Sequence, residues 1–411
     1  MARADVRRLV RGVGAAVLGV LVLGPNLAGA QVDARTSVFY EPSASSQLLV
    51  VHPTVSVGVP VSSALSINAG YEADVVSGAT EAVKAGPLVD VVTAATSFDD
   101  VRHVGRGGFE LRRDVARIGA SYAYGVESDY RSHAVAVTAG TDLLDRNTQI
   151  DLGYARGFDR VCTTDFSRTL APSARSALDS SSGCFTDREN RASRSIDLDN
   201  FQVGWTQAWT PVFATQMVLT ASLAHGFLEN PYRSVVIGPV GEQALENHPD
   251  NRARAALGLR GKYFLREADT ALTLGLRAYR DSWALTSETV ELEAEHYLRP
   301  WLRGLVRARV YHQSGALFWS DDYTGGEPEL GPRGQYWTGD RELSPLWSYL
   351  VGGRVLATLR PDGRTLGVFS SFSFGLGVDV SKVDLLEFTW SGTTPDDTLS
   401  ILGTLTIGGA F

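Results

Sequence analysis

Several features that would assign this chain to a common class of protein are scarce or absent. It has only 2 cysteines in 411 residues, and its net charge is −8. A negative balance argues against nucleic acid as a partner, which would favour a basic stripe. Mean hydropathy is −0.04, and beyond residue 30 no apolar run is long enough for a transmembrane helix. These absences leave a soluble β protein or a membrane-spanning β-barrel.

Catalytic signatures are also absent. The seven histidines are scattered, with no His-x-x-x-His spacing, and no Gly-x-Ser-x-Gly motif occurs. We therefore predict that the chain is not an enzyme and needs no cofactor. An outer-membrane hydrolase remains a remote alternative, because such enzymes can assemble their sites from residues that are distant in sequence.

The two cysteines, Cys162 and Cys184, share one polar segment. In an exported protein this arrangement favours a disulfide, and two free thiols are the alternative. A metal site there is not predicted, because the segment contains no histidine.

The start of the chain has the pattern of an export signal. Arg3, Arg7, Arg8 and Arg11 precede an apolar run over 13–23, and 28–30 reads Ala-Gly-Ala. We predict a signal peptide over 1–30, Sec-type export and a mature chain of 31–411. A membrane-anchoring helix is the alternative, but the run is shorter than the ~20 residues that span a bilayer.

The end of the chain alternates between apolar and polar residues, as a half-buried strand does. Leu399, Ile401, Leu405, Ile407 and Phe411 form the apolar face. A last strand that closes on Phe resembles the sorting signal of outer-membrane β-barrels in Gram-negative bacteria. The resemblance implies outer-membrane lipid and the barrel-assembly machinery as partners, the latter through the strand ending at Phe411. We expect this strand to pair with the strand near 37–40, so that the sheet has no open edge.

Short and long connections alternate along the chain. Short ones lie at 59–63, 114–116, 144–147, 211–214, 266–269, 299–301 and 361–364, and long polar ones lie at 76–102, 159–195, 229–251, 315–345 and 379–397. An up-and-down barrel has this asymmetry, with tight periplasmic turns and longer external loops. We predict an all-β fold: a single antiparallel transmembrane barrel of about 16 strands (14–18). Aromatic residues near strand ends, Trp283 among them, would form its interfacial girdles.

One face of several predicted strands is more charged than a packed core would accept. Unpaired charges cost several kcal/mol each in a sandwich core but little in a wet lumen, so they favour the barrel. Pairing about the 299–301 turn would put Glu293 near Arg307 and Glu291 near Arg309. The predicted lumen charges are Glu291, Glu293, Glu295, Arg303, Arg307, Arg309, Arg254, Arg260, Lys262, Arg277 and Arg354.

A more specific pattern lies near the N-terminal end. Asp-Val-Val-Ser-Gly-Ala-Thr over 74–80 returns as Asp-Val-Val-Thr-Ala-Ala-Thr over 90–96, and Phe-Asp-Asp-Val-Arg follows over 98–102. With the opening strand at 37–41, an Arg-Asn-Thr turn at 146–148 and Gly-Tyr at 153–154, this stretch resembles domain-of-unknown-function family 3570. The resemblance implies a secreted outer-membrane β-barrel and no reaction. Its motif residues are Asp74, Ser77, Gly78, Ala79, Thr80, Asp90, Thr93, Thr96, Arg102, Arg146, Asn147 and Thr148.

Three interpretations of the repeated motif remain open. An Asp with a hydroxyl residue three positions on can cap a turn through backbone N–H groups. Alternatively, Asp74, Asp90, Asp99 and Asp100 offer the oxygen ligands that calcium prefers, although not at the spacing of a calcium loop. A partner-docking surface is the third interpretation.

Two functions follow from these patterns. The first is a pore or export channel whose Arg and Glu side chains set selectivity, with a small solute or an exported polymer as its cargo. The second is a non-conducting barrel that serves as a surface scaffold or docks periplasmic machinery. Loops 159–195 and 315–345 would favour the second function if they fold in and plug the lumen.

Overall fold

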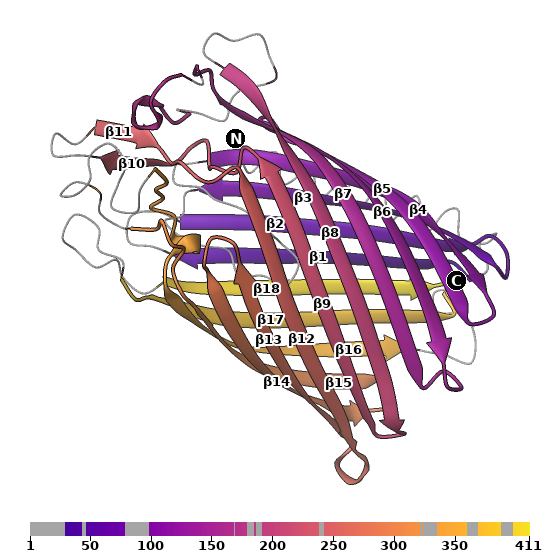
Figure 1. Ribbon diagram of the computed structural model, residues 1–411. Helices are drawn as coiled ribbons and strands as arrows, with labels where there is room; N and C mark the ends of the chain where they lie inside the picture. The colour runs from indigo at the N-terminus through magenta and orange to yellow at the C-terminus, as the bar shows by residue number, and fades with distance from the viewer. Residues whose placement is uncertain are drawn as a thin grey trace.

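A computed structural model describes residues 29–42, 47–78, 98–167, 169–178, 185, 191–237, 242–320, 323, 335–359, 369–387 and 398–411. Within these ranges, 16 strands close into one antiparallel barrel, in the order β1-β18-β17-β16-β15-β14-β13-β12-β9-β8-β7-β6-β5-β4-β3-β2 (Figure 1). The predicted barrel of about sixteen strands is confirmed. None of the described helices is long and apolar enough to cross a membrane.

The barrel strands, in chain order, are β1 Gln31–Pro42, β2 Gln47–Pro60, β3 Leu65–Gly78, β4 Phe98–Arg113, β5 Ala116–Val126, β6 Tyr130–Leu143, β7 Thr148–Thr164, β8 Arg191–Thr210, β9 Phe213–Gly226, β12 Asn251–Leu265, β13 Thr270–Asp281, β14 Thr286–Arg299, β15 Leu302–Gln313, β16 Leu346–Leu359, β17 Ser371–Leu385 and β18 Thr398–Ala410. A separate hairpin joins β10 Ser234–Ile237 to β11 Glu242–Leu245. Short 3-10 helices are η2 Pro172–Ala174, η3 Arg266–Ala268 and η4 Arg341–Leu343.

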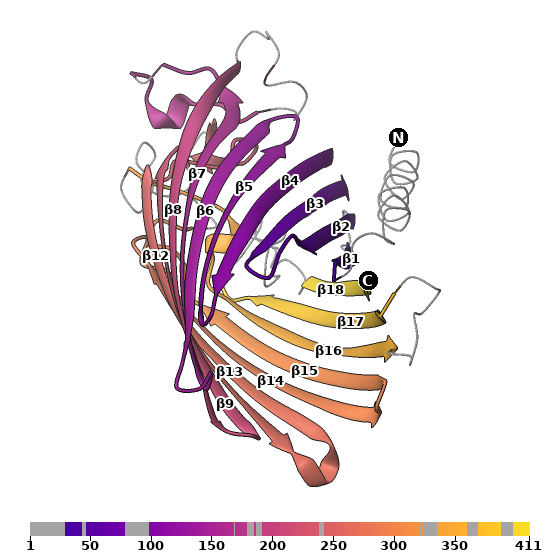
Figure 2. The same ribbon diagram turned by 90° about the vertical axis from the view of Figure 1, so that its right-hand side faces the viewer.

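The two ends of the barrel differ as the connection lengths predict. Tight connections join β2 to β3, β4 to β5, β6 to β7, β8 to β9, β12 to β13 and β14 to β15, all at what we call the turn end. The described parts of the long connections, with β10 and β11, lie at the opposite loop end (Figures 1 and 2). The connection predicted at 361–364 lies outside the described residues.

The terminal strand closes the barrel against the first strand. The predicted pairing of the last strand with the strand near 37–40 is confirmed, and Ser37 lies opposite Thr404 in the β1–β18 register. Beyond β18, the backbone N–H of Phe411 donates to the carbonyl of Ala30 at 2.9 Å. The Phe411 ring packs on Phe369, with ring centroids 4.9 Å apart. The seam therefore combines a hydrogen-bonded ladder with an apolar cluster at the turn end.

The outer face carries an apolar belt. Exposed leucines such as Leu219, Leu274 and Leu376 alternate with inward polar residues along their strands, which is the pattern of a lipid-facing barrel surface. Trp209 and Trp301 are exposed near the turn end. The girdle prediction is wrong for Trp283, which is 4% exposed within a cluster at the loop end.

Candidate functional site: the lumen wall and the outer cap

The inner face of the barrel carries all eleven of the predicted lumen charges. The β12–β16 registers place them on the face opposite the apolar belt. Two of these inward cations remain accessible: the side chains of Arg260 and Lys262 are 50% and 54% exposed. Such exposure on an inner face means that the lumen is not packed with side chains at this level.

Two inward arginines cross a glycine to reach an acid two strands away. Arg307 of β15 lies opposite Gly352 of β16, which lies opposite Asp379 of β17. The Arg307 guanidinium donates to both Asp379 carboxylate oxygens, at 2.9 and 2.7 Å. A Cβ on Gly352 would overlap Asp379 Oδ1. The missing side chain therefore provides the path for this ion pair, which we call a glycine-crossing pair.

The same arrangement recurs on the opposite wall. Arg117 of β5 crosses Gly140 of β6 and bonds Asp151 of β7, and it also donates to Asp142 at 3.3 Å. A Cβ on Gly140 would overlap the Arg117 guanidinium. Each glycine-crossing pair ties three neighbouring strands together from the inside.

The predicted cross-strand pairs need one correction. The register does put Glu293 opposite Arg307 and Glu291 opposite Arg309. However, Arg307 bonds Asp379, and Glu293 instead bonds Arg260 of β12. The arginine side chain is long, so its guanidinium group extends past a glycine to the next strand as easily as it turns to the residue beside it.

The remaining ladder residues divide into paired and unpaired groups. Glu295 bonds both Arg303, at 2.7 Å, and Lys262, at 3.4 Å. Among the described residues, Arg277 and Arg354 have no acidic partner within salt-bridge distance. Arg254 also faces inward, opposite Asp281 of β13. Arg277 and Arg354 therefore add positive charge to this part of the wall.

The family motif contributes to the inner wall near the loop end. Asp74 lies inside β3 rather than at a turn, so the turn interpretation is wrong for this residue. Its carboxylate contacts Nδ1 of His52 at 2.6 Å, and Arg102 lies directly opposite it on β4. Arg102 also lies over the ring of Tyr130, 5.9 Å from its centroid. Two motif positions that are distant in sequence thus meet in one polar cluster.

Other parts of the motif lie outside the described residues, namely Ala79, Thr80, Asp90, Thr93 and Thr96. Ser77 and Gly78 end β3, and the backbones of Asp99 and Asp100 begin β4 opposite Ser77 and Val76. The cation-site hypothesis therefore stays a prediction. Within the described ranges, no group of three His, Cys, Asp or Glu side chains has metal-binding geometry.

The predicted Arg-Asn-Thr turn connects β6 to β7 at the turn end. The backbones of Leu144, Asp145 and Arg146 all have positive φ, a conformation that residues other than glycine adopt at a cost in free energy. Asn147 holds this turn, because its backbone and side-chain N–H groups both donate to the Leu144 carbonyl at 3.0 Å. Thr148 donates to Gln207 at 2.5 Å. These motif residues therefore have a structural role.

Of the two cysteines, Cys162 lies at the outer end of β7 and is fully buried. Cys184 lies outside the described residues, so the disulfide stays a prediction.

Three loops at the loop end form a packed body that we call the outer cap, made of residues 169–178, 227–237, 242–250, 314–320 and 335–345. The backbones of Asn247 and Trp337 exchange hydrogen bonds of 3.1 and 2.9 Å. Trp337 is fully buried, and its ring N–H donates to the Leu245 carbonyl at 3.0 Å. The Leu245 N–H donates to the Arg175 carbonyl at 2.7 Å. All three loops are thus interlocked.

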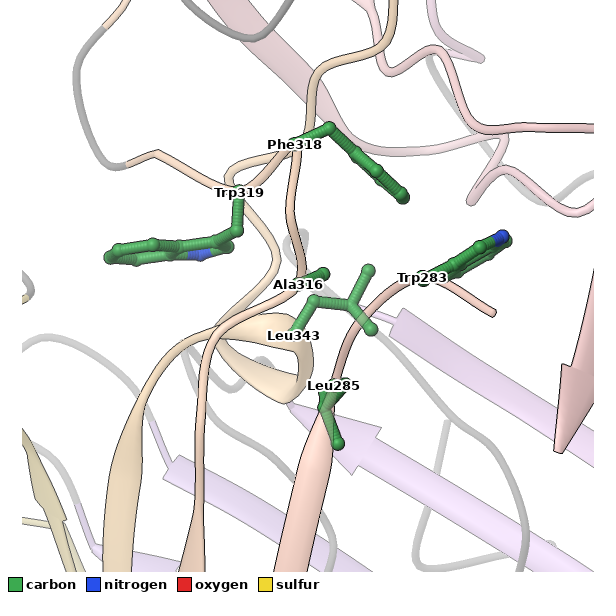
Figure 3. Close-up of a cluster of buried hydrophobic side chains, with 6 residues drawn as sticks. All are labelled: Trp283, Leu285, Ala316, Phe318, Trp319 and Leu343. Carbon is green, nitrogen blue, oxygen red and sulfur yellow. The ribbon is translucent and has the colours of Figure 1, made fainter. Parts of the chain in front are cut away.

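The cap extends over the barrel mouth. Six buried side chains from the 281–285 turn and from residues 316–319 and 343 meet in one cluster (Figure 3). This cluster packs on inward-facing Tyr279 of β13 and Leu385 of β17. Arg341 of η4 donates to Thr398 of β18 at 2.6 Å. Inward-facing Gln313 donates to the Ser344 carbonyl, also at 2.6 Å. Residues 314–320 and 335–345 are therefore fixed across the mouth on the β13–β18 side.

Buried charges join the two halves of the cap. Glu246 is 1% exposed and accepts hydrogen bonds from the Thr338 hydroxyl and the Gly339 N–H, at 2.9 and 3.0 Å. His248 places Nε2 3.5 Å from Glu246 and donates from Nδ1 to the Leu228 carbonyl at 3.0 Å. Arg233 pairs with Asp340. These charged residues belong to no sequence motif, although aromatic residues in a polar loop are a signal that the loop is packed.

These buried charges predict that the stability of the cap depends on pH. Burial alone would lower the pKa of His248, but the carboxylates of Glu246, Glu229 and Asp340 outweigh it, so the pKa of His248 is raised. Burial raises the pKa of Glu229. Both shifts make the folded cap less stable as pH rises. His248 loses the proton that its neighbouring carboxylates stabilise, and Glu229 must carry a buried negative charge. We expect the protection of 242–248 from hydrogen exchange, taken relative to the intrinsic exchange rate at each pH, to fall at alkaline pH, by more in the wild type than in His248→Gln. Equal pH profiles would contradict this assignment.

The model of the family described as "Protein of unknown function (DUF3570)" matches residues 21–381. No curated protein matches. A structure titled "Bacterial polysaccharide outer membrane secretin" is 11% identical, with a TM-score of 0.49 over 94% of this chain and 99% of the other. Pseudomonas aeruginosa OccD3 (OpdP) is 9% identical, with a TM-score of 0.41 over 94% of this chain and 92% of the other. Vibrio cholerae OmpT, in its trimer form, is 8% identical, with a TM-score of 0.44 over 93% and 100%.

Proposed function

The chain belongs to the family described as "Protein of unknown function (DUF3570)", and we propose that it is an outer-membrane channel for small anionic solutes. In this proposal the turn end faces the periplasm and the cap faces outward. The apolar belt supports the membrane placement, because it matches the lipid-facing surface of a transmembrane barrel.

The observation that carries the channel proposal is the exposure of inward cations. Arg260 and Lys262 keep about half of their side-chain surface accessible. A water-filled lumen explains this exposure, since desolvated charges would be costly. The inward Arg277 and Arg354 add positive charge that no nearby acid neutralises among the described residues. Rings of charge select permeating ions, so an arginine excess favours anions.

The interlocked cap favours a second candidate, a non-conducting barrel that displays the cap as a docking surface. Two buried clusters and the Glu246 hydrogen bonds make the cap more ordered than a simple tether needs to be. In that case the lumen would be water-filled but closed at its outer mouth.

The test of the channel proposal is ion selectivity in planar bilayers. We expect the wild type to conduct with anion preference, and Arg277→Gln to shift the reversal potential in a salt gradient toward cations. The matched control is Arg280→Gln, which removes the same charge from the outer face of the same strand, β13. Silence at all voltages would favour the docking candidate, whereas equal shifts in both variants would contradict selection by the inner wall.

A further inference from the structure

We propose that the outer surface of β6 and β7 binds the phosphorylated headgroup of a membrane lipid through Arg131 and Arg160. The inference rests on the membrane placement proposed above but not on channel activity, so the two can fail separately. Figure 1 shows β6 and β7 side by side on one wall of the barrel.

The first argument is the register of these two arginines. Arg131 of β6 lies directly opposite Arg160 of β7, and both side chains are exposed. Residues directly opposite on antiparallel strands have Cβ atoms about 5 Å apart, and like charges in such positions are destabilising. Neither arginine has an acidic partner in the part of the chain that the structure describes. An anion bound between the two guanidinium groups would remove the repulsion.

The second argument is the order of side chains along the outer face of β6. Val137 and Val135, each 48% exposed, continue the apolar belt. His133 follows, with Nδ1 2.7 Å from the Tyr122 hydroxyl, and Arg131 lies one step farther toward the loop end. Apolar residues thus give way to aromatic ones and then to a cation. Aromatic girdles mark the membrane interface, so the next position outward is at the level of lipid phosphates.

The third argument is a contrast with the neighbouring cation. Arg156 lies on the same face of β7 but is already occupied by Asp199 at 3.1 Å and Asp197 at 4.0 Å. Arg131 instead lies over the ring of Phe185, 4.3 Å from its centroid. A ring contact leaves the guanidinium N–H groups available. Arginine binds phosphate bidentately through its planar fork, so a phosphate monoester is the ligand that best fits two facing arginines.

The experiment uses the full-length barrel in lipid nanodiscs of phosphatidylcholine, with and without phosphatidic acid as the phosphate-monoester probe. Native mass spectrometry counts the phosphatidic acid molecules that stay bound. We expect Arg131→Gln with Arg160→Gln to lower retention about tenfold, because two charge-assisted contacts are lost. Arg280→Gln, which removes an isolated outer-face arginine, is expected to retain the lipid as the wild type does.

Several outcomes would overturn the proposal. Equal retention by the double variant and the wild type would remove the site. Equal losses in the double variant and Arg280→Gln would show only general attraction between charges. Displacement of the lipid by millimolar inorganic phosphate would identify a free-phosphate site instead. Heat modifiability of each variant on gels verifies that the barrel has folded, so a loss of binding cannot be mistaken for misfolding.

Discussion

Replacing residues 317–342 with a short Gly-Ser linker is expected to raise single-channel conductance severalfold. This segment contains Trp337 and η4, and the Arg341–Thr398 hydrogen bond holds η4 across the mouth. The linker is compatible with the fold, because the Ala316 N–H already bonds the Leu343 carbonyl at 2.7 Å. Without the segment, the barrel mouth loses its cover on the β13–β18 side while the strands stay intact.

A matched pair of point variants controls for this deletion. Phe318 is 4% exposed within the cap cluster, whereas the preceding Leu317 is 64% exposed. Phe318→Ser is expected to increase conductance or its fluctuations, and Leu317→Ser to leave both unchanged. A wild type that is silent but conducts after the deletion would support the docking candidate. Conductance that the deletion leaves unchanged would mean that the cap does not restrict the lumen.

Gly352→Ala is expected to destabilise the barrel strongly. The added methyl group would displace the Asp379 carboxylate and break its pair with Arg307. The side chains of Arg307 and Asp379 are only 16% and 10% exposed. Breaking such a buried pair costs about 3 kcal/mol. Urea unfolding of the barrel in liposomes, followed by tryptophan fluorescence, measures the loss.

The neighbouring glycine provides the control for this prediction. A Cβ on Gly353 would meet nothing closer than the Leu305 carbonyl at 3.5 Å, an ordinary contact on the outer face. Gly353→Ala is therefore expected to change the unfolding midpoint little. If both alanine variants unfold alike, the glycine-crossing pair does not contribute measurably to stability.

The sequence predicts the barrel well because its signals are local. Strand faces follow a period of two, so the inward position of Glu291 and Arg303 can be read directly from spacing. Connection length likewise separates the two ends of the barrel. The closing pair of β1 and β18 needs only the rule that a membrane barrel leaves no free edge.

The missed features depend on contacts between distant segments. Arg307 and Asp379 are on strands two apart, and only the barrel register shows that Gly352 leaves the path between them open. Trp283 has the composition of a girdle residue but lies where three loops converge. Glu246 and His248 carry no motif at all, because their role comes from burial beneath Thr338 and Phe318.

The glycine-crossing pairs also constrain how the protein can move. Each one acts as a brace across three strands, so the circumference of the tube cannot widen at that level without giving up a buried ion pair. The barrel wall is therefore not expected to widen and narrow during transport. Any change in permeability is therefore expected to originate in the cap, which continues from β15 after Gln313 and joins β16 at Leu346.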